Sequence, residues 1–211
     1  MIILQRLSNT INIKVQADLI NTCSSAFDLS ALQRAIIFQL KNVFHTSVGR
    51  YSVDINTNLH VLQNKNQCSP KNVLFQVVDD IQGRNPAEAD FKGLRIKLNK
   101  LVVNDIITSK NIRTIPHEMG HLFGWDHPHA RAKYESINPE AHPLEQQLTE
   151  DERKHNLMSQ GWYAQRARVP LEQAMQISEK QIELLLLNYA GQKLNRNFHL
   201  KSFLIWNKLL N

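Results

Sequence analysis

The stretch HEMGHLFGWDH, residues 117–127, limits what this chain can fold into more than any other part of the sequence. On a helix, side chains four residues apart lie on one face, so the imidazoles of His117 and His121 can reach one metal ion. Gly124 suits the left-handed conformation that ends a helix, and the turn that follows would bring His127 to the same ion from another direction. The spacing therefore predicts a helix that ends at Gly124 and a zinc ion held by three histidines.

Glu118 is placed to act on water rather than to bind the ion. It follows the first histidine directly, so its carboxylate lies beside the ion but away from the natural position of a third ligand. Three histidine ligands leave a fourth coordination position open for water, which distinguishes a catalytic zinc site from a structural one. We expect a bound zinc ion to lower the pKa of this water, while Glu118 takes its proton.

A second short motif, NLMSQ at residues 156–160, lies downstream of the histidines. The histidine pattern resembles the His-Glu-x-x-His-x-x-Gly-x-x-His signature of the metzincin zinc endopeptidases, and NLMSQ resembles their Met-turn. The resemblance implies a zinc endopeptidase with one catalytic ion, in which Met158 forms an apolar floor beneath the zinc-binding histidines. Some metzincins have a tyrosine two residues after this methionine, where this chain has Gln160, and the subfamily stays unassigned.

The resemblance also implies an architecture. At 211 residues, of which 42% are hydrophobic and 21% charged, the chain is typical of one globular domain. We predict a metzincin-like α/β (α+β) fold for this single catalytic domain, residues 1–211. Residues 1–124 would form an upper subdomain with a mixed twisted sheet and two long helices. Residues 125–191 would form a small irregular lower subdomain that ends in a helix, with the active-site cleft between the two, and residues 192–211 a C-terminal tail.

Strands are predicted from alternating or continuous apolar residues. The predicted strands are 11–17, 51–55, 59–62, 73–78 and 94–98. In residues 94–98 one face is polar, which favours an edge strand. Metzincins lay an extended substrate on such an edge strand by backbone pairing, and an edge strand that binds no ligand is an equally good interpretation.

Capping boxes, in which a Ser or Thr and a Glu or Gln three residues later bond to each other's backbone, predict three helix starts. They are Ser30 with Gln33, Thr149 with Glu152, and Ser178 with Gln181. The helix of the histidine motif is expected to begin close to Thr114 and Pro116, because threonine is a good N-cap residue and proline is tolerated in the first turn. Gly191 is the expected end of the last helix.

Several further residues are candidates for the surroundings of the site. Phe123 and Trp125 are expected to pack around it, and Asp126 either hydrogen-bonds a ligand imidazole or lies exposed in a turn. Residues 161–163 form either the wall of a substrate pocket, as the resemblance implies, or part of the interior. The histidines without fixed spacing to the motif are expected at the surface, and these are His129, His142 and His155.

Cysteine content and charge exclude several classes of protein. Cys23 and Cys68 are the only cysteines, so there is no disulfide framework, and either one bridge or two free thiols remain open. Two cysteines are also too few for the archaeal-type metzincin branch with its second zinc. The net charge is +6, but the basic residues are scattered without interleaved aromatics, which argues against nucleic-acid binding.

The apolar start of the chain is too short for a signal-peptide core or a membrane span. Either the protein is intracellular or an export segment has been removed. The family resemblance favours a secreted or periplasmic protein, and a cytoplasmic one stays open. The expected partner is a protein or peptide substrate.

Two alternative functions are considered. The first is a proteolytic toxin or effector whose tail, residues 192–211, docks a partner protein by an apolar helix face. The second is a non-catalytic binding module that keeps zinc for stability. The intact Glu118 argues against the second, because a structural zinc site needs no base beside an open coordination position.

Overall fold

The computed structural model describes residues 1–91, 93–129, 137–170 and 173–195. The strands are β1 (Ile2–Leu7), β2 (Thr10–Asn21), β3 (Thr46–Val48), β4 (Tyr51–Leu62), β5 (Val73–Val78), β6 (Ala87–Ala89) and β7 (Arg95–Asn99). The α-helices are α1 (Leu29–Phe44), α2 (Lys100–Ile107), α3 (Thr114–Phe123), α4 (Pro143–Gln146), α5 (Glu150–His155), α6 (Gly161–Arg166) and α7 (Glu179–Ala190). Among these helices, none is long and apolar enough to cross a membrane.

The strands form one mixed sheet in the order β3-β4-β2-β5-β7-β6, and β1 pairs with β2 outside this path. β2 runs parallel to β4 and β5, and β5 runs parallel to β7, whereas β1, β3 and β6 are antiparallel to their neighbours. The predicted α/β class with a mixed sheet is therefore confirmed. The two strands predicted at 51–55 and 59–62 are one continuous strand, β4.

The prediction that residues 94–98 form an edge strand was wrong. β7 (95–99) lies between β5 and β6, so both of its sides are paired, and the edge strand of the sheet at this end is β6 (87–89). Alternation of polar and apolar side chains indicates that one face of a strand is buried, but it does not reveal how many neighbours the strand has. A strand of three residues is also too short to produce a recognisable alternation.

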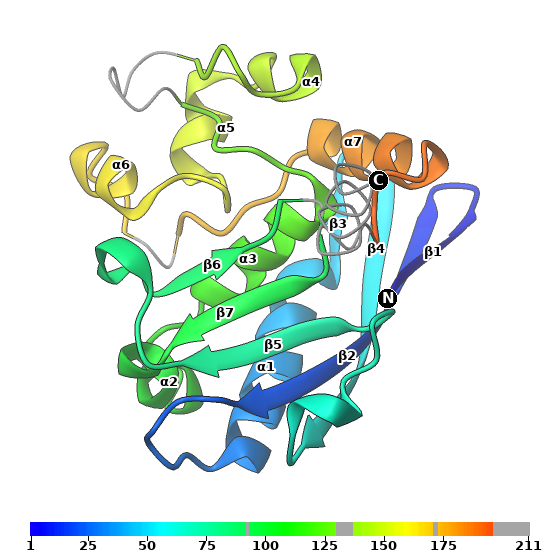
Figure 1. Cartoon of the computed structure of the whole chain (residues 1–211). Helices are drawn as coiled ribbons and strands as arrows, with labels where there is room; N and C mark the ends of the chain where they lie inside the picture. Colours follow the sequence, from blue (N-terminus) through cyan, green and yellow to red (C-terminus); the bar gives the residue numbers. More distant parts are fainter. Residues whose placement is uncertain (92, 130–136, 171–172, 196–211) are drawn as a thin grey trace, which may run out of the picture.

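Helices α1 and α3 cover the same face of the sheet and pack against each other (Figure 1). The start of α1 differs from the prediction: Asp28 is its N-cap, with a carboxylate that accepts from the N–H of Ala31, and Ser30 lies inside the first turn. The other two capping boxes, before α5 and α7, are confirmed with both reciprocal hydrogen bonds. Helix α2 was not predicted. It begins directly after β7, and no Gly or Pro separates the apolar residues of the two elements.

One cluster of buried apolar side chains extends from Ile2 to Leu194 and joins the sheet with α1, α3 and α7. Phe123 and Trp125 are fully buried in it and contact the ring of Phe44, with centroids 5.3 and 6.0 Å away, which confirms their predicted packing role. The helices α4, α5 and α6 gather on one side of the molecule, next to the end of the sheet that carries β6 (Figure 1).

Two further expectations concern cysteines and the tail. Cys23 and Cys68 are both free, half-buried thiols, which decides between the two alternatives left by the sequence. Of the predicted tail, residues 196–211 lie outside the described residues.

Candidate metal centre

Helix α3 carries the histidine motif, and its two ends are fixed by different residues. The side chain of Asn111 accepts from the backbone N–H groups of Arg113 (3.3 Å) and Thr114 (3.1 Å). The helix begins at Thr114, as predicted, but the capping oxygen comes from Asn111 rather than from the threonine. The other end agrees with the prediction: Gly124 is left-handed with φ of 86°, and the N–H of Trp125 bonds to the carbonyl of Gly120.

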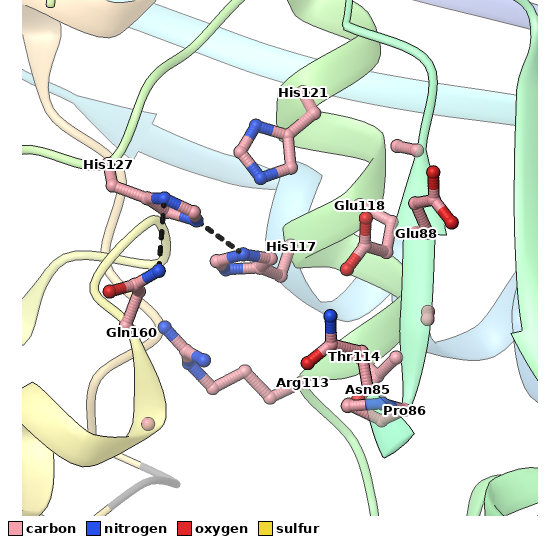
Figure 2. Close-up of a pocket in the computed structure, with 13 residues that line it drawn as sticks. Asn85, Pro86, Glu88, Arg113, Thr114, His117, Glu118, His121, His127 and Gln160 are labelled. Atoms are coloured by element: carbon pink, nitrogen blue, oxygen red, sulfur yellow. Dashed lines mark hydrogen bonds between the residues drawn. The ribbon is translucent and has the colours of Figure 1, made fainter. Parts of the chain in front are cut away.

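The three histidines of the motif converge. One ring nitrogen of each lies within 4.8 Å of those of the other two, and the Nε2 atoms of His117 and His127 are 3.3 Å apart. Two nitrogens that bind a tetrahedral zinc ion at 2.0–2.1 Å lie about 3.3–3.4 Å from each other. Figure 2 shows the rings of His117, His121 and His127 grouped around one side of the cavity. The donor set therefore fits a zinc ion.

The two helical histidines are held in the orientation and tautomer that metal binding requires. Nδ1 of His117 lies 2.8 Å from the carbonyl oxygen of Leu157, and Nδ1 of His121 lies 2.9 Å from that of Trp125. Because a carbonyl oxygen only accepts, each Nδ1 carries the proton and each Nε2 keeps its lone pair. Burial lowers the pKa of both imidazoles, that of His117 to well below 6.5, so both rings are neutral at pH 7 and competent to bind metal.

His127 contacts Gln160, the residue two positions after Met158. Its Nδ1 lies 3.4 Å from the side-chain amide nitrogen of Gln160, as Figure 2 shows. Rotating this amide by 180° places its oxygen at the same position, where it accepts from Nδ1–H and leaves Nε2 of His127 for a metal. Gln160 therefore contacts a candidate ligand.

Glu118 is 7% exposed and lies between α3 and β6. Its carboxylate points into the same cavity as the histidine rings (Figure 2). Burial raises its pKa to about 7, although a hydrogen bond from the backbone of Ala89 and the charge of Arg113 act in the opposite direction. A carboxyl group with a pKa near 7 is suited to taking up and returning a proton at neutral pH.

The cavity has a volume of about 370 Å³ and lies between parts of the chain that are distant in sequence. Residues 85–89, which include β6, form one wall. Helix α3 forms its base, and His127 and Gln160 form the wall opposite β6. Gly161 also lines the cavity. The cavity is therefore bounded by an edge strand on one side and by the end of the NLMSQ segment on the other.

Met158 lies directly against the helix that carries the histidines. Its side chain is fully buried, and a Cβ atom added to Gly120 would lie 2.4 Å from its sulfur atom. Gly120 directly precedes His121. Only glycine at this position lets the sulfur atom of Met158 come so close to the helix. The position agrees with the apolar floor that the Met-turn resemblance implies, and that role stays a prediction.

The structure places the remaining candidates differently. The prediction that His129 lies at the surface was wrong, because it is 1% exposed and stacks on Tyr163 with ring centroids 4.0 Å apart. Sequence spacing carries no information on burial, and a histidine ring has two flat faces that pack well on an aromatic ring. Tyr163 is 2% exposed and belongs to the interior, whereas Gly161 lines the cavity. Asp126, for which two alternatives were left open, is half-buried rather than exposed, and a hydrogen bond to a ligand imidazole stays a prediction.

Sequence reasoning missed two polar residues near the site. Arg113 lines the cavity and bonds to backbone carbonyls near Met158. Glu145 is fully buried and accepts from the backbone N–H of Asp126, one residue before His127. Neither residue belongs to a motif. Arg113 could have been noticed only because it lies four residues before His117, and Glu145 only because it lies in a short helix that begins with proline.

No protein-family model matches the sequence, and no curated protein matches it. Among solved structures, the chain is similar to the crystal structure of archaemetzincin from Methanopyrus kandleri, with a TM-score of 0.43 and 12% sequence identity. The match covers 83% of this chain and 96% of that chain. A similarity of this size does not transfer residue roles between chains, so the chemistry of the site is inferred from its own geometry.

Proposed function

We propose that this protein is a zinc-dependent endopeptidase in which His117, His121 and His127 bind the ion. The observation that carries the proposal is the convergence of three imidazoles beside the buried carboxylate of Glu118, in a cavity open to one side of an edge strand. A zinc ion bound there would polarise the scissile carbonyl and acidify a water molecule.

Glu118 moves the proton. Its carboxylate faces the cavity beside the histidines, so it accepts a proton from the attacking water and returns it to the nitrogen of the leaving amine. The low exposure of Glu118 strengthens this transfer, because the carboxylate has little competing solvent around it.

Strand β6 is the proposed binding surface for an extended substrate. Pro86 and Asp90, on either side of β6, bond towards β7. The carbonyl of Pro86 accepts from the N–H of Asn99, and the N–H of Asp90 donates to the carbonyl of Arg95. In an antiparallel pair the direction of backbone bonding alternates, so Ala87 presents its N–H and C=O groups to the cavity. A peptide in the cavity can therefore add to the sheet as a further strand.

The proposal is tested by digestion of casein with purified protein, with a chelator, and after zinc is added back. Activity should disappear with the chelator and return with zinc. Glu118→Gln should keep one bound zinc and lose at least about 100-fold in turnover, the usual contribution of a positioned proton-transfer group. His121→Ala should lose zinc itself, whereas the matched control His60→Ala, at an exposed histidine of β4, should change neither zinc content nor turnover.

The same measurements decide against the proposal in two ways. Substantial cleavage by Glu118→Gln would remove that residue from the mechanism. Stoichiometric zinc with no cleavage of casein or of a peptide library would favour the zinc-stabilised binding module. Docking of a partner by the tail is a separate proposal, tested by deletion of residues 196–211 and loss of a complex with cleavage retained.

A further inference from the structure

Arg113 lies directly before α3 and lines the cavity, yet it belongs to neither the histidine motif nor the NLMSQ segment. Its guanidinium donates to three backbone carbonyls, those of Leu157 (2.5 Å), Ser159 and Ala174 (2.9 Å). These carbonyls lie 44 to 61 residues further along the chain. One side chain therefore fastens the turn around Met158 to the start of the helix that bears the histidines.

The carbonyl of Leu157 has a second donor. The Nδ1 atom of His117 lies 2.8 Å from the same oxygen that Arg113 contacts. A carbonyl oxygen has two lone pairs, so it can accept both bonds at once. A bond from a charged guanidinium is stronger than one from a neutral donor, and it fixes the position of the oxygen to which the imidazole is oriented.

We propose that Arg113 is a positioning residue that sets the orientation of His117 through the carbonyl of Leu157. The inference rests on the proposed function only in taking His117 as a zinc ligand. The hydrogen bonds of the Arg113 guanidinium go to the backbone carbonyls of the turn, while the side chain also lines the cavity. Arg113 bonds to the turn around Met158 and so fixes the carbonyl of Leu157. This carbonyl orients the His117 ring so that its Nε2 faces the cavity.

His121 provides an internal comparison. Its Nδ1 partner is the carbonyl of Trp125, four residues away, whose place is set by the local turn at Gly124. The position of this carbonyl is therefore fixed by the backbone of the turn itself. His117, in contrast, depends on a carbonyl 40 residues away, and Arg113 is the side chain that connects this carbonyl to α3. Loss of Arg113 should therefore disturb one ligand and leave the other unchanged.

The test compares Arg113→Lys with wild type. Lysine keeps the positive charge but lacks the planar fork that reaches several carbonyls at once. Zinc affinity, measured by competition with a chromophoric chelator, should fall about 10- to 100-fold, the usual effect of losing a partner of a ligand histidine. In the NMR spectrum of the histidine rings, the Nδ1–H signal of His117 should shift or exchange with water, and that of His121 should not.

Arg153→Lys is the matched control. Arg153 is also buried and donates to a backbone carbonyl, that of Leu148, but this carbonyl contacts no histidine of the motif. Both variants should lose stability in urea, and only Arg113→Lys should lose zinc affinity. Equal losses of affinity in the two variants would make the role of Arg113 merely structural and would overturn the proposal.

Two other outcomes would also overturn it. Unchanged zinc affinity together with an unchanged His117 Nδ1–H signal would show that the carbonyl needs no arginine. Unchanged affinity with a raised KM confined to peptides that carry an acidic side chain would show that Arg113 binds substrate instead. The NMR measurement is repeated on metal-free protein, so the orientation of His117 is tested even if the wild type binds no zinc or cleaves no peptide.

Discussion

Residues 1–124 and residues 125–195 build the two sides of the cavity by different means. The first region contains the whole sheet and the helices α1 to α3, and apolar side chains fill its interior. The described part of the second region contains four α-helices, three of which have six residues or fewer. Among the described residues, it holds most of the buried polar side chains, and those in this region are His129, Glu145, Arg153, Asn156, Ser159, Ser178, Gln181 and Asn188.

The difference shows how each side of the site is positioned. Apolar packing is non-directional, but strand ladders and a long helix already fix the backbone of the first region. The loops of the second region have no such ladder, so directional hydrogen bonds from buried side chains define their course. Asn156 and Gln181 exchange two amide hydrogen bonds of 3.0 and 3.1 Å, and Asn156 also accepts from the N–H of Met158. Trp125 donates to the carbonyl of Gln181, so the start of α7 fastens both turns of the site.

The largest effect is expected from truncation in the first region. Phe75 is fully buried on β5, between Leu19 of β2 and Ile96 of β7. Phe75→Ala should lower the free energy of unfolding by about 3–5 kcal/mol, because it leaves a cavity in close-packed surroundings. The zinc affinity of the molecules that remain folded should stay within about two-fold of wild type. Phe38→Ala, at a phenylalanine that is 55% exposed, is the control in urea unfolding.

A smaller loss of stability and a larger loss of zinc affinity are expected in the second region. Gln181→Ala leaves the buried amide of Asn156 without its partner and should cost about 1–3 kcal/mol. Asn156 accepts from the N–H of Met158, and Leu157, whose carbonyl contacts His117, lies between these two residues. Zinc affinity should therefore fall more in Gln181→Ala than in Phe75→Ala. Gln165→Ala, at an exposed glutamine of α6, is the matched control. If Phe75→Ala lost more zinc affinity than Gln181→Ala, the contrast between the two regions would be wrong.

Local features of the fold and the site followed from the sequence. The convergence of the histidines, the left-handed Gly124 and the capping boxes of α5 and α7 each depend on residues within about ten positions of one another. The N-terminus of α1, which was predicted wrongly, also depends on nearby residues. Asp28 and Ser30 are both good N-cap residues, and local preference does not choose between them.

Features that depend on distant contacts did not follow from the sequence. β7 is an inner strand because β6 pairs with it. His129 is buried because it stacks on Tyr163, which lies 34 residues away. The bonds from Arg113 to Leu157 and Ser159 join segments more than 40 residues apart. Such contacts leave no periodic trace, because any buried polar residue can find its partner anywhere in the chain once the fold brings the two together.

The smallest effect is expected from the charge of Glu145, which tests whether the second region tolerates an ionised carboxyl group in its interior. Glu145 is fully buried, and burial together with the charge of Asp126 raises its pKa to about 8, although the backbone N–H of Asp126 acts in the opposite direction. The folded protein therefore binds this proton more tightly than the unfolded chain, whose carboxyl pKa is 4.5. The stability that the proton contributes is complete below pH 4.5 and is lost as the pH rises towards 8, by at most about 1.4 kcal/mol per pH unit.

Glu145→Gln should remove this dependence, because the amide keeps an oxygen that accepts from Asp126 and cannot ionise. Between pH 6.5 and 7.5, the free energy of unfolding of metal-free wild type should fall by about 1 kcal/mol more than that of Glu145→Gln. Glu150→Gln is the control, since Glu150 is exposed and its hydrogen bond with Lys154 lowers its pKa, which leaves it ionised throughout this range. Equal slopes for wild type and Glu145→Gln would mean that Glu145 is ionised in the folded protein. In that case the N–H of Asp126 would stabilise a buried charge one residue away from His127, and the polar interior of the second region would include a permanent anion.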